Sequence, residues 1–179
     1  MDVYILRHGK AEEHGPGVAD ENRKLTKRGR REVAETGGWM AAQELTFDTI
    51  ATSPLARAHE TAKIVADVLE IPDRLVVWDM LAPGGEPDAI CHELDNHPDA
   101  GAFLLVGHEP LLSSLISRMI AGNESAGIIM TKGGLAKIRN FSIHSHPSGE
   151  LHWLLTVKQM AGTGQNGKRS GPADHVFLR

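Results

Sequence analysis

Two histidines and two arginines occupy positions that point to chemistry rather than to core packing. Arg7 and His8 follow one short apolar run, His108 follows another, and Arg57 lies just after a predicted helix start. Arginine offers planar, paired N–H donors that match phosphate oxygens. A neutral imidazole can attack phosphorus without help from a metal ion. Together these residue types indicate phosphoryl transfer, in which the remaining catalysis is alignment and charge stabilisation.

The elements that must position these residues alternate between strand and helix. Short apolar runs predict buried parallel strands at Val3–Leu6, Thr49–Thr52, Leu75–Trp78 and Phe103–Val106. Helices are predicted after an N-cap at Thr26, from Ser53–Pro54, after the turn Pro83–Gly85 and from Pro110. A closing strand pair is predicted at Leu135–Ile138 and Leu151–Leu155. This alternation predicts a three-layer α/β/α sandwich around a mostly parallel central sheet.

The four candidate residues are expected to converge on one edge of this sheet. Ligands of open α/β sheets bind outside the carboxyl ends of the strands, and Arg7, His8, Arg57 and His108 all follow such ends. Taken singly, each has an ordinary interpretation, since an arginine in a first helical turn is usually solvated and a histidine after a strand is usually a loop residue. Four of them after three strands favour a shared anion site.

The composition limits the classes of protein and partner. The chain has 179 residues, 19 Lys and Arg, 23 Asp and Glu, and a formal net charge of -4. This length suits one domain with a well-buried core, and the mild acidity argues against a general nucleic-acid binder. The ten histidines outnumber Phe, Trp and Tyr combined. The single cysteine, Cys91, excludes an internal disulfide and a multi-cysteine metal site, and it is predicted to be a small core residue.

The sequence predicts a cytoplasmic protein with no membrane partner. No apolar stretch is long enough to span a bilayer, and the first residues lack the basic flank, apolar run and cleavage site of a signal peptide. Residues 1–160 are predicted to form the domain. Residues 161–179, rich in Gly, Asn, Lys, Arg and Ser, are predicted to be a poorly ordered tail.

Four segments resemble the motifs of the histidine phosphatase superfamily, the phosphoglycerate-mutase-like fold, and occur in the same order. They are Leu6–Gly9, Leu25–Gly29, Ser53–Ala62 and Val106–Pro110. An Arg-His-Gly triplet alone is weak evidence, whereas the ordered set is highly specific, and the resemblance covers Met1 to about Val157. Within the superfamily, the compact length and the segments Leu81–Gly85 and Thr131–Ala136 resemble the SixA-type phosphohistidine phosphatases.

The resemblance implies a role for each candidate residue. His8 would attack phosphorus and become phosphohistidine, while Arg7 and Arg57 bind the phosphate oxygens. His108 would donate to the same oxygens and stabilise the transition state, and Arg23 matches a position that often adds a further phosphate contact. Water would then hydrolyse the phosphoenzyme, with net retention at phosphorus. No cofactor and no metal are implied, and the other ring nitrogen of His8 is expected to donate to a backbone carbonyl.

One departure from the wider superfamily bears on the substrate. Mutases and broad phosphatases of this fold carry a carboxylate just after the leucine that follows the third strand, and this carboxylate protonates the leaving alkoxide. Here the stretch is Leu81-Ala82-Pro83, with Asp79 and Glu86 nearby but off the expected position. A positioned general acid contributes about a hundred- to ten-thousand-fold to the rate. The phosphorus–nitrogen bond of phosphohistidine breaks more readily, because the ring leaves neutral once protonated.

The missing acid and the lack of a long insertion that could form a lid both favour a phosphohistidine-bearing protein as substrate. The resemblance suggests that this partner is a histidine-containing phosphotransfer domain. The predicted function is therefore metal-independent hydrolysis of phosphohistidine on a protein, through a covalent intermediate at His8.

Three alternatives remain from the sequence alone. The first is a small-molecule phosphomonoesterase of the same fold, with Asp79 or Glu86 as the general acid. The second is a non-catalytic phosphoprotein-binding module, which would not need His8 as a nucleophile. The third is a metal site, for which solvated histidines are the simpler interpretation. Its candidate ligands are His144 with His146, beside a predicted turn at Pro147–Gly149, and His92 with His97.

Overall fold

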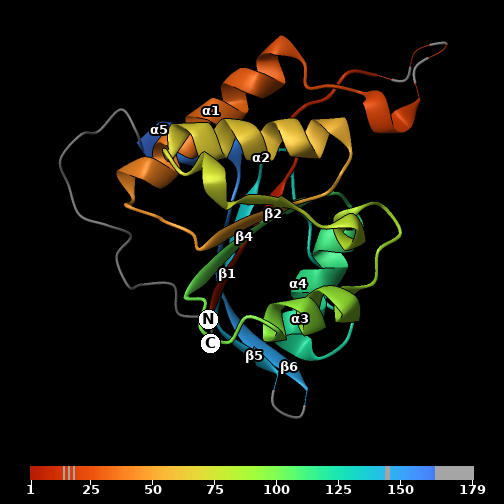
Figure 1. Ribbon diagram of the computed structural model, residues 1–179, viewed down its shortest axis with the longest axis vertical. Helices are drawn as coiled ribbons and strands as arrows, with labels where there is room; N and C mark the ends of the chain where they lie inside the picture. Colours follow the sequence, from red (N-terminus) through yellow and green to blue (C-terminus); the bar gives the residue numbers. More distant parts are fainter. Residues whose placement is uncertain (14, 16, 18, 144–145, 164–179) are drawn as a thin grey trace.

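A computed structural model describes residues 1–13, 15, 17, 19–143 and 146–163 of the chain (Figure 1). The main elements are β1 (Asp2–Arg7), α1 (Lys27–Ala42), β2 (Thr49–Thr52), α2 (Ala56–Val68), β3 (Leu75–Val77), α3 (Pro87–Asp95), β4 (Ala102–Gly107), α4 (Leu111–Ala121), β5 (Leu135–Ile143), β6 (Pro147–Leu155) and α5 (Val157–Thr163). Short 3-10 helices are η1 (Asp20–Asn22), η2 (Pro72–Arg74) and η3 (Asp79–Leu81).

The sheet is mostly parallel, as the sequence predicts. Through the described residues its strands follow the order β3-β2-β4-β1-β5-β6. The first four run parallel to one another, whereas β5 pairs antiparallel with both β1 and β6. The predicted strands agree with the observed ones, and the closing pair is confirmed. The four parallel strands therefore bring their carboxyl ends to one edge.

Two helical layers cover the sheet, which confirms the three-layer sandwich. Figure 1 shows α1, α2 and α5 over one face, with α3 and α4 over the other. Strand β1 is buried on both faces: Val3 and Ile5 pack into the core beneath α3 and α4, and Tyr4 and Leu6 pack into the core beneath α1 and α2. An apolar run without alternation is what a central parallel strand requires.

Two predicted boundaries are wrong. Helix α2 begins at Ala56, after an N-cap at Leu55, and not at Ser53–Pro54. Ser53 lies just beyond β2 and still bonds to β4, because its N–H donates to the Val106 carbonyl at 3.0 Å. The predicted turn at Pro147–Gly149 is instead the first part of β6. Proline is tolerated there because β6 is an edge strand, where a missing N–H costs no ladder bond.

Helix α5 crosses the predicted boundary between domain and tail, since it runs to Thr163. The rest of the predicted tail, residues 164–179, lies outside the described residues. Among the helices of the described segments, none is both long and apolar enough to cross a membrane.

The first turn of α1 packs directly on the chain that follows β1. Thr26 caps this helix as predicted, because its Oγ1 accepts from the Gly29 N–H at 3.0 Å. A Cβ added to Gly29 would lie 2.1 Å from the carbonyl oxygen of Lys10. Position 29 therefore requires glycine, because the backbones of α1 and of Lys10 approach closely here. Lys10 is only two residues beyond His8.

We expect Gly29→Ala to lower the free energy of unfolding by roughly 2–4 kcal/mol, because the backbone must move to admit the methyl group. Gly38 is the matched control, since it is an exposed glycine in α1 with no atom within 4 Å of an added Cβ. Gly38→Ala should raise stability by about 0.5–1 kcal/mol. Urea unfolding of both variants tests the pair, and equal effects would contradict the close approach.

Candidate active site

The two candidate histidines are neighbours because β1 and β4 pair in register. Arg7 lies opposite Gly107 in the parallel ladder, so the next residues, His8 and His108, leave the sheet side by side. The His8 N–H still donates to the Gly107 carbonyl at 3.1 Å. The two ring centroids are 4.9 Å apart. Residues separated by 100 positions in the sequence thus form one pair at the predicted edge.

The orientation of the His8 ring is fixed through its neighbour. Its Nδ1 lies 2.8 Å from the Gly9 carbonyl oxygen, and a carbonyl can only accept, so Nδ1 carries the proton. The Gly9 N–H donates to Thr61 Oγ1 at 3.1 Å, and this hydroxyl donates to the Arg57 carbonyl at 2.7 Å. The expected bond from His8 to a backbone carbonyl is confirmed. Nε2 therefore keeps its lone pair.

Both rings are neutral over the physiological pH range. His8 is 7% exposed and His108 is 2% exposed. Burial, with contributions from the positive charges of Arg57, Arg7 and Lys132, lowers the pKa of His8 to about 4, although its bond to Gly9 opposes the shift. Burial and the nearby His8, Arg57 and Arg7 lower the pKa of His108 to about 3. A neutral His8 is a competent nucleophile.

The two arginines are held at their ends, which leaves their inner nitrogens unused. Arg7 donates from one terminal nitrogen to the Met130 carbonyl at 2.7 Å. Arg57, 4% exposed, donates from both terminal nitrogens to Asp20, at 2.8 Å to the carbonyl and 3.0 Å to Oδ2. The Nε atoms of both arginines and Nδ1 of His108 are buried and have no partner in the described part of the chain.

These three nitrogens come from the ends of β1 and β4 and the first turn of α2. A buried donor without a partner costs about 1–3 kcal/mol, so three such donors around one histidine pair indicate a site for a ligand that accepts hydrogen bonds. Two of them belong to the guanidinium groups of Arg7 and Arg57, whose charges lower the pKa of both histidines. The ligand that fits this set is an oxyanion.

Ser53 orients the second histidine. Its Oγ lies 2.8 Å from Nε2 of His108 and also accepts from the Leu55 N–H at 3.3 Å. The sequence assigns Ser53 to a helix cap, so this bond across two strand ends was not predicted. Only the strand register could indicate this bond in advance, because β2 and β4 end at the same level of the sheet.

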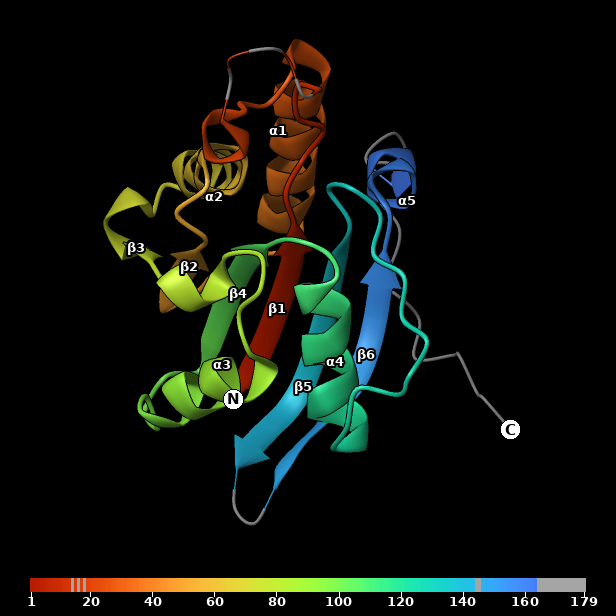
Figure 2. The ribbon, with the colours of Figure 1, turned by 90° about the vertical axis from the view of Figure 1, so that its right-hand side faces the viewer.

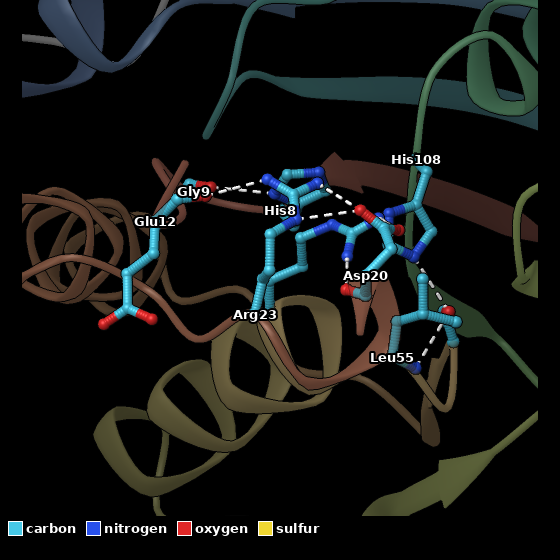
Figure 3. Close-up of polar contacts among 9 residues, drawn as sticks. His8, Gly9, Glu12, Asp20, Arg23, Leu55 and His108 are labelled. Carbon is cyan, nitrogen blue, oxygen red and sulfur yellow. Dashed lines mark hydrogen bonds and ion pairs between the residues drawn. The ribbon is translucent and has the colours of Figure 1, made fainter. Parts of the chain in front are cut away.

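Asp20 is the site residue that sequence reasoning missed. Its carboxylate bridges Arg57 and Arg23, with Arg23 Nε donating to Oδ1 at 2.8 Å. Figure 3 shows Asp20 and Arg23 beside the two histidines. Partial burial raises the pKa of Asp20, but the bonds to Arg23 and Arg57 outweigh it and hold the pKa below its usual value. The only available signal was its position three residues before Arg23.

Arg23 reaches the site through Asp20. A terminal nitrogen of its guanidinium donates to the Glu12 carbonyl at 2.8 Å, and another lies 2.6 Å from Asp20 Oδ1. The structure thus brings Arg23 to the group formed by His8, His108 and Arg57. A direct phosphate contact from Arg23 stays a prediction.

The segment where the wider superfamily carries its acid lies beside His108, and it holds no carboxylate. The Leu81 carbonyl is 3.3 Å from where a Cβ on Gly107 would be, and the next residue is Ala82. Asp79 and Glu86 are exposed. Within the described part of the chain, neither carboxylate forms a hydrogen bond or ion pair with a site residue.

Metal ligation finds no support in the geometry. The described residues contain no group of three or more His, Cys, Asp or Glu that could hold a metal ion. His97 stacks on Trp78 with ring centroids 6.2 Å apart and lies 3.5 Å from a Glu93 carboxylate oxygen. His144 lies outside the described residues. Cys91 is a buried core residue, as predicted, and burial raises the pKa of its thiol to about 12.

Comparisons with known proteins agree in family and fold. A model of the histidine phosphatase superfamily (branch 1) matches residues 3–82. An uncharacterized protein of Picosynechococcus is 31% identical over 163 residues, which cover 88% of this chain and 98% of that protein. The phosphohistidine phosphatase SixA of Escherichia coli is 25% identical over 158 residues, covering 87% of this chain and 94% of SixA.

A solved structure of the protein histidine phosphatase SixA complexed with tungstate has the same fold. It superposes with a TM-score of 0.79 at 24% identity and covers 89% of this chain and 99% of that one.

Removing the charge of Asp20 should strengthen anion binding. In Asp20→Asn the backbone carbonyl still holds Arg57, while the negative charge that competes for its guanidinium is gone. We expect the dissociation constant for inorganic phosphate to fall roughly fivefold, the effect of about 1 kcal/mol between nearby charges. Calorimetric titration measures it. Glu21→Gln removes the same charge from an exposed neighbour in η1 and should change the constant less than twofold. Equal effects would show that only net charge matters.

The buried histidines should make the fold sensitive to mild acid. In the unfolded chain an imidazole takes up a proton below about pH 6.5, whereas folded His8 does so only below about pH 4. Between these values the unfolded state binds more protons, so the free energy of unfolding falls as the pH is lowered. His8 alone should remove about 2 kcal/mol between pH 7 and pH 5.

Urea unfolding of the wild type and His8→Asn at both pH values measures this contribution. The variant should lose about 2 kcal/mol less than the wild type, because asparagine does not titrate. His92→Asn, at an exposed position on α3, controls for the loss of one histidine. A His8→Asn variant that loses as much as the wild type would contradict the low pKa of His8.

Proposed function

Because the chain belongs to the histidine phosphatase superfamily, we propose that it hydrolyses phosphohistidine on a protein substrate through a phosphorylated His8. One observation carries the proposal. The neutral His8 ring keeps the lone pair of Nε2 beside three buried donor nitrogens that lack partners in the described residues. That arrangement supplies both a nucleophile for phosphorus and donors for the phosphoryl oxygens.

In the first step, Nε2 of His8 forms a bond to phosphorus while the phosphorus–nitrogen bond of the substrate breaks. The substrate ring leaves as a neutral imidazole, because its other nitrogen carries a proton before the bond breaks. The inner nitrogens of Arg7 and Arg57 donate to the phosphoryl oxygens, where the transition-state charge is spread. In the second step, water attacks phosphorus and returns His8 with inorganic phosphate, and two inversions give net retention.

His108 completes the donor set in this proposal. In this proposal the ring proton of His108 lies on Nδ1, and Nε2 accepts from the Ser53 hydroxyl across their 2.8 Å contact, since a hydroxyl can either donate or accept. Nδ1 is the buried atom without a partner, so it is the nitrogen that would donate to the phosphoryl group. Ser53 then holds the orientation of the His108 ring, as Gly9 holds that of the His8 ring.

The choice of leaving group rests on the segment after β3. Ala82 stands where the resemblance implies an acid in other members, and the exposed Asp79 and Glu86 form no hydrogen bond or ion pair with a site residue in the described part of the chain. Without a proton donor an alkoxide leaves slowly, by about a hundred- to ten-thousand-fold, whereas a protonated imidazole ring leaves unaided. The relative named as a phosphohistidine phosphatase supports this choice. A histidine-containing phosphotransfer domain as partner, and a cytoplasmic location, stay predictions.

The test compares kcat/KM for a phosphohistidine-bearing protein, an aryl phosphate and an alkyl phosphate. We expect the alkyl phosphate to be at least about a hundredfold poorer, and His8→Ala to lose at least about a thousandfold on the phosphohistidine substrate. Quenching with alkaline denaturant during turnover should trap labelled phosphate on His8, because the phosphorus–nitrogen bond survives in base and is lost in acid. Asp79→Asn and Glu86→Gln are the matched controls and should keep wild-type rates.

Each alternative predicts a different result. A small-molecule phosphomonoesterase would turn over the alkyl phosphate as well as phosphohistidine and lose that activity in Asp79→Asn or Glu86→Gln. A binding module would show no turnover and no label on His8.

A further inference from the structure

An open groove of about 570 Å³ lies between α1, α5 and the segment that leads into β5. Its walls include Arg28 and Arg31 from α1, Thr131 and Lys132 before β5, and Val157 and Lys158 from α5. Figure 2 shows α5 alongside α1, with the chain that enters β5 rising beside them.

The groove adjoins the active site through one turn of backbone. The Gly133 N–H donates to the carbonyls of Arg7 and His8, at 3.1 and 3.2 Å. Gly133 has a φ of +72°, and a Cβ added to it would lie 2.6 Å from Val157 Cγ2 in the groove wall. The residue before it, Lys132, lines the groove and contributes to the low pKa of His8. The groove wall at Lys132 is therefore next to the turn that bonds to the backbone of Arg7 and His8.

The charge of the groove is positive although the whole chain is acidic. Its two acidic residues, Glu32 and Glu35, are engaged by Arg28 and Arg31 on the same helix, at 2.6 and 3.8 Å. Lys132 and Lys158 form no ion pair within the described residues. Two lysines thus remain uncompensated in a protein whose net charge is -4.

We propose that this groove binds an acidic segment of the substrate protein that flanks its phosphohistidine. The proposal rests on the proposed function and names the surface that selects the substrate. The carboxylates of the segment would lie against Lys132 and Lys158 while the phosphoryl group sits between Arg7 and Arg57. Charge complementarity of this kind acts on encounter and selectivity more than on the chemical step.

Three synthetic peptides of equal length test the proposal, each with one phosphohistidine and with acidic, neutral or basic flanks. For the wild type we expect kcat/KM to be about tenfold higher for the acidic peptide than for the neutral one, with the gain falling at high salt. Lys158→Glu should remove that preference and keep the neutral peptide within twofold of wild type. Lys132→Glu combined with Lys158→Glu should favour the basic peptide. Lys63→Glu, an exposed lysine on α2 outside the groove, is the control and should keep the acidic preference.

The outcomes separate this inference from the function on which it rests. Equal kcat/KM for the three peptides, with turnover intact, would overturn the proposed role of the groove and leave the proposed function standing. An acidic preference that survives Lys158→Glu and the double variant would place the selectivity elsewhere and also overturn it. If the wild type hydrolyses none of the peptides, the proposed function fails. The affinities of the same peptides, measured by fluorescence, then test whether the groove binds acidic segments. Equal affinities for the acidic and neutral forms would overturn that proposal.

Discussion

The parallel pairing of β1 with β4 is the constraint on which the site depends. It sets Arg7 opposite Gly107, so the two strands end at the same level and deliver one histidine each. The same ladder leaves the His8 N–H bonded to the Gly107 carbonyl, which fixes the backbone of His8. The pairing survives because β1 is buried on both faces and tied into two separate cores. The geometry of the candidate site is therefore a consequence of the strand register.

Around this pair, every other contact limits the freedom of one reactive group. Gly9 and Thr61 settle the tautomer of His8, and Ser53 lies against the far nitrogen of His108. Met130 and Asp20 hold the outer ends of the arginines. The nitrogens that these contacts leave without a partner in the described residues are as informative as those that they engage. The donors that remain without a partner suit a tetrahedral anion. They are already oriented, so binding such an anion would require no rearrangement of the site.

The sequence allows the fold and the central pair to be predicted, because both follow from local patterns. Apolar runs mark the parallel strands, and residues that end such strands must share an edge. The N-cap at Thr26 is predictable for the same reason, because it depends only on residues within one helical turn. Asp20 was not predictable, because its role arises from a loop that folds back over α2 across 37 positions. The start of α2 was misplaced for a related reason, since Ser53 keeps its strand pairing.

Asp20 also bears on the last step of the proposed reaction. Its backbone carbonyl and one carboxylate oxygen accept from the two terminal nitrogens of Arg57, so a bound phosphoryl group would compete with an internal anion for the same charge. The net affinity for any anion is then a difference between two similar interactions. In the proposed reaction, this competition would weaken the binding of inorganic phosphate to the buried guanidinium and so favour release of the product.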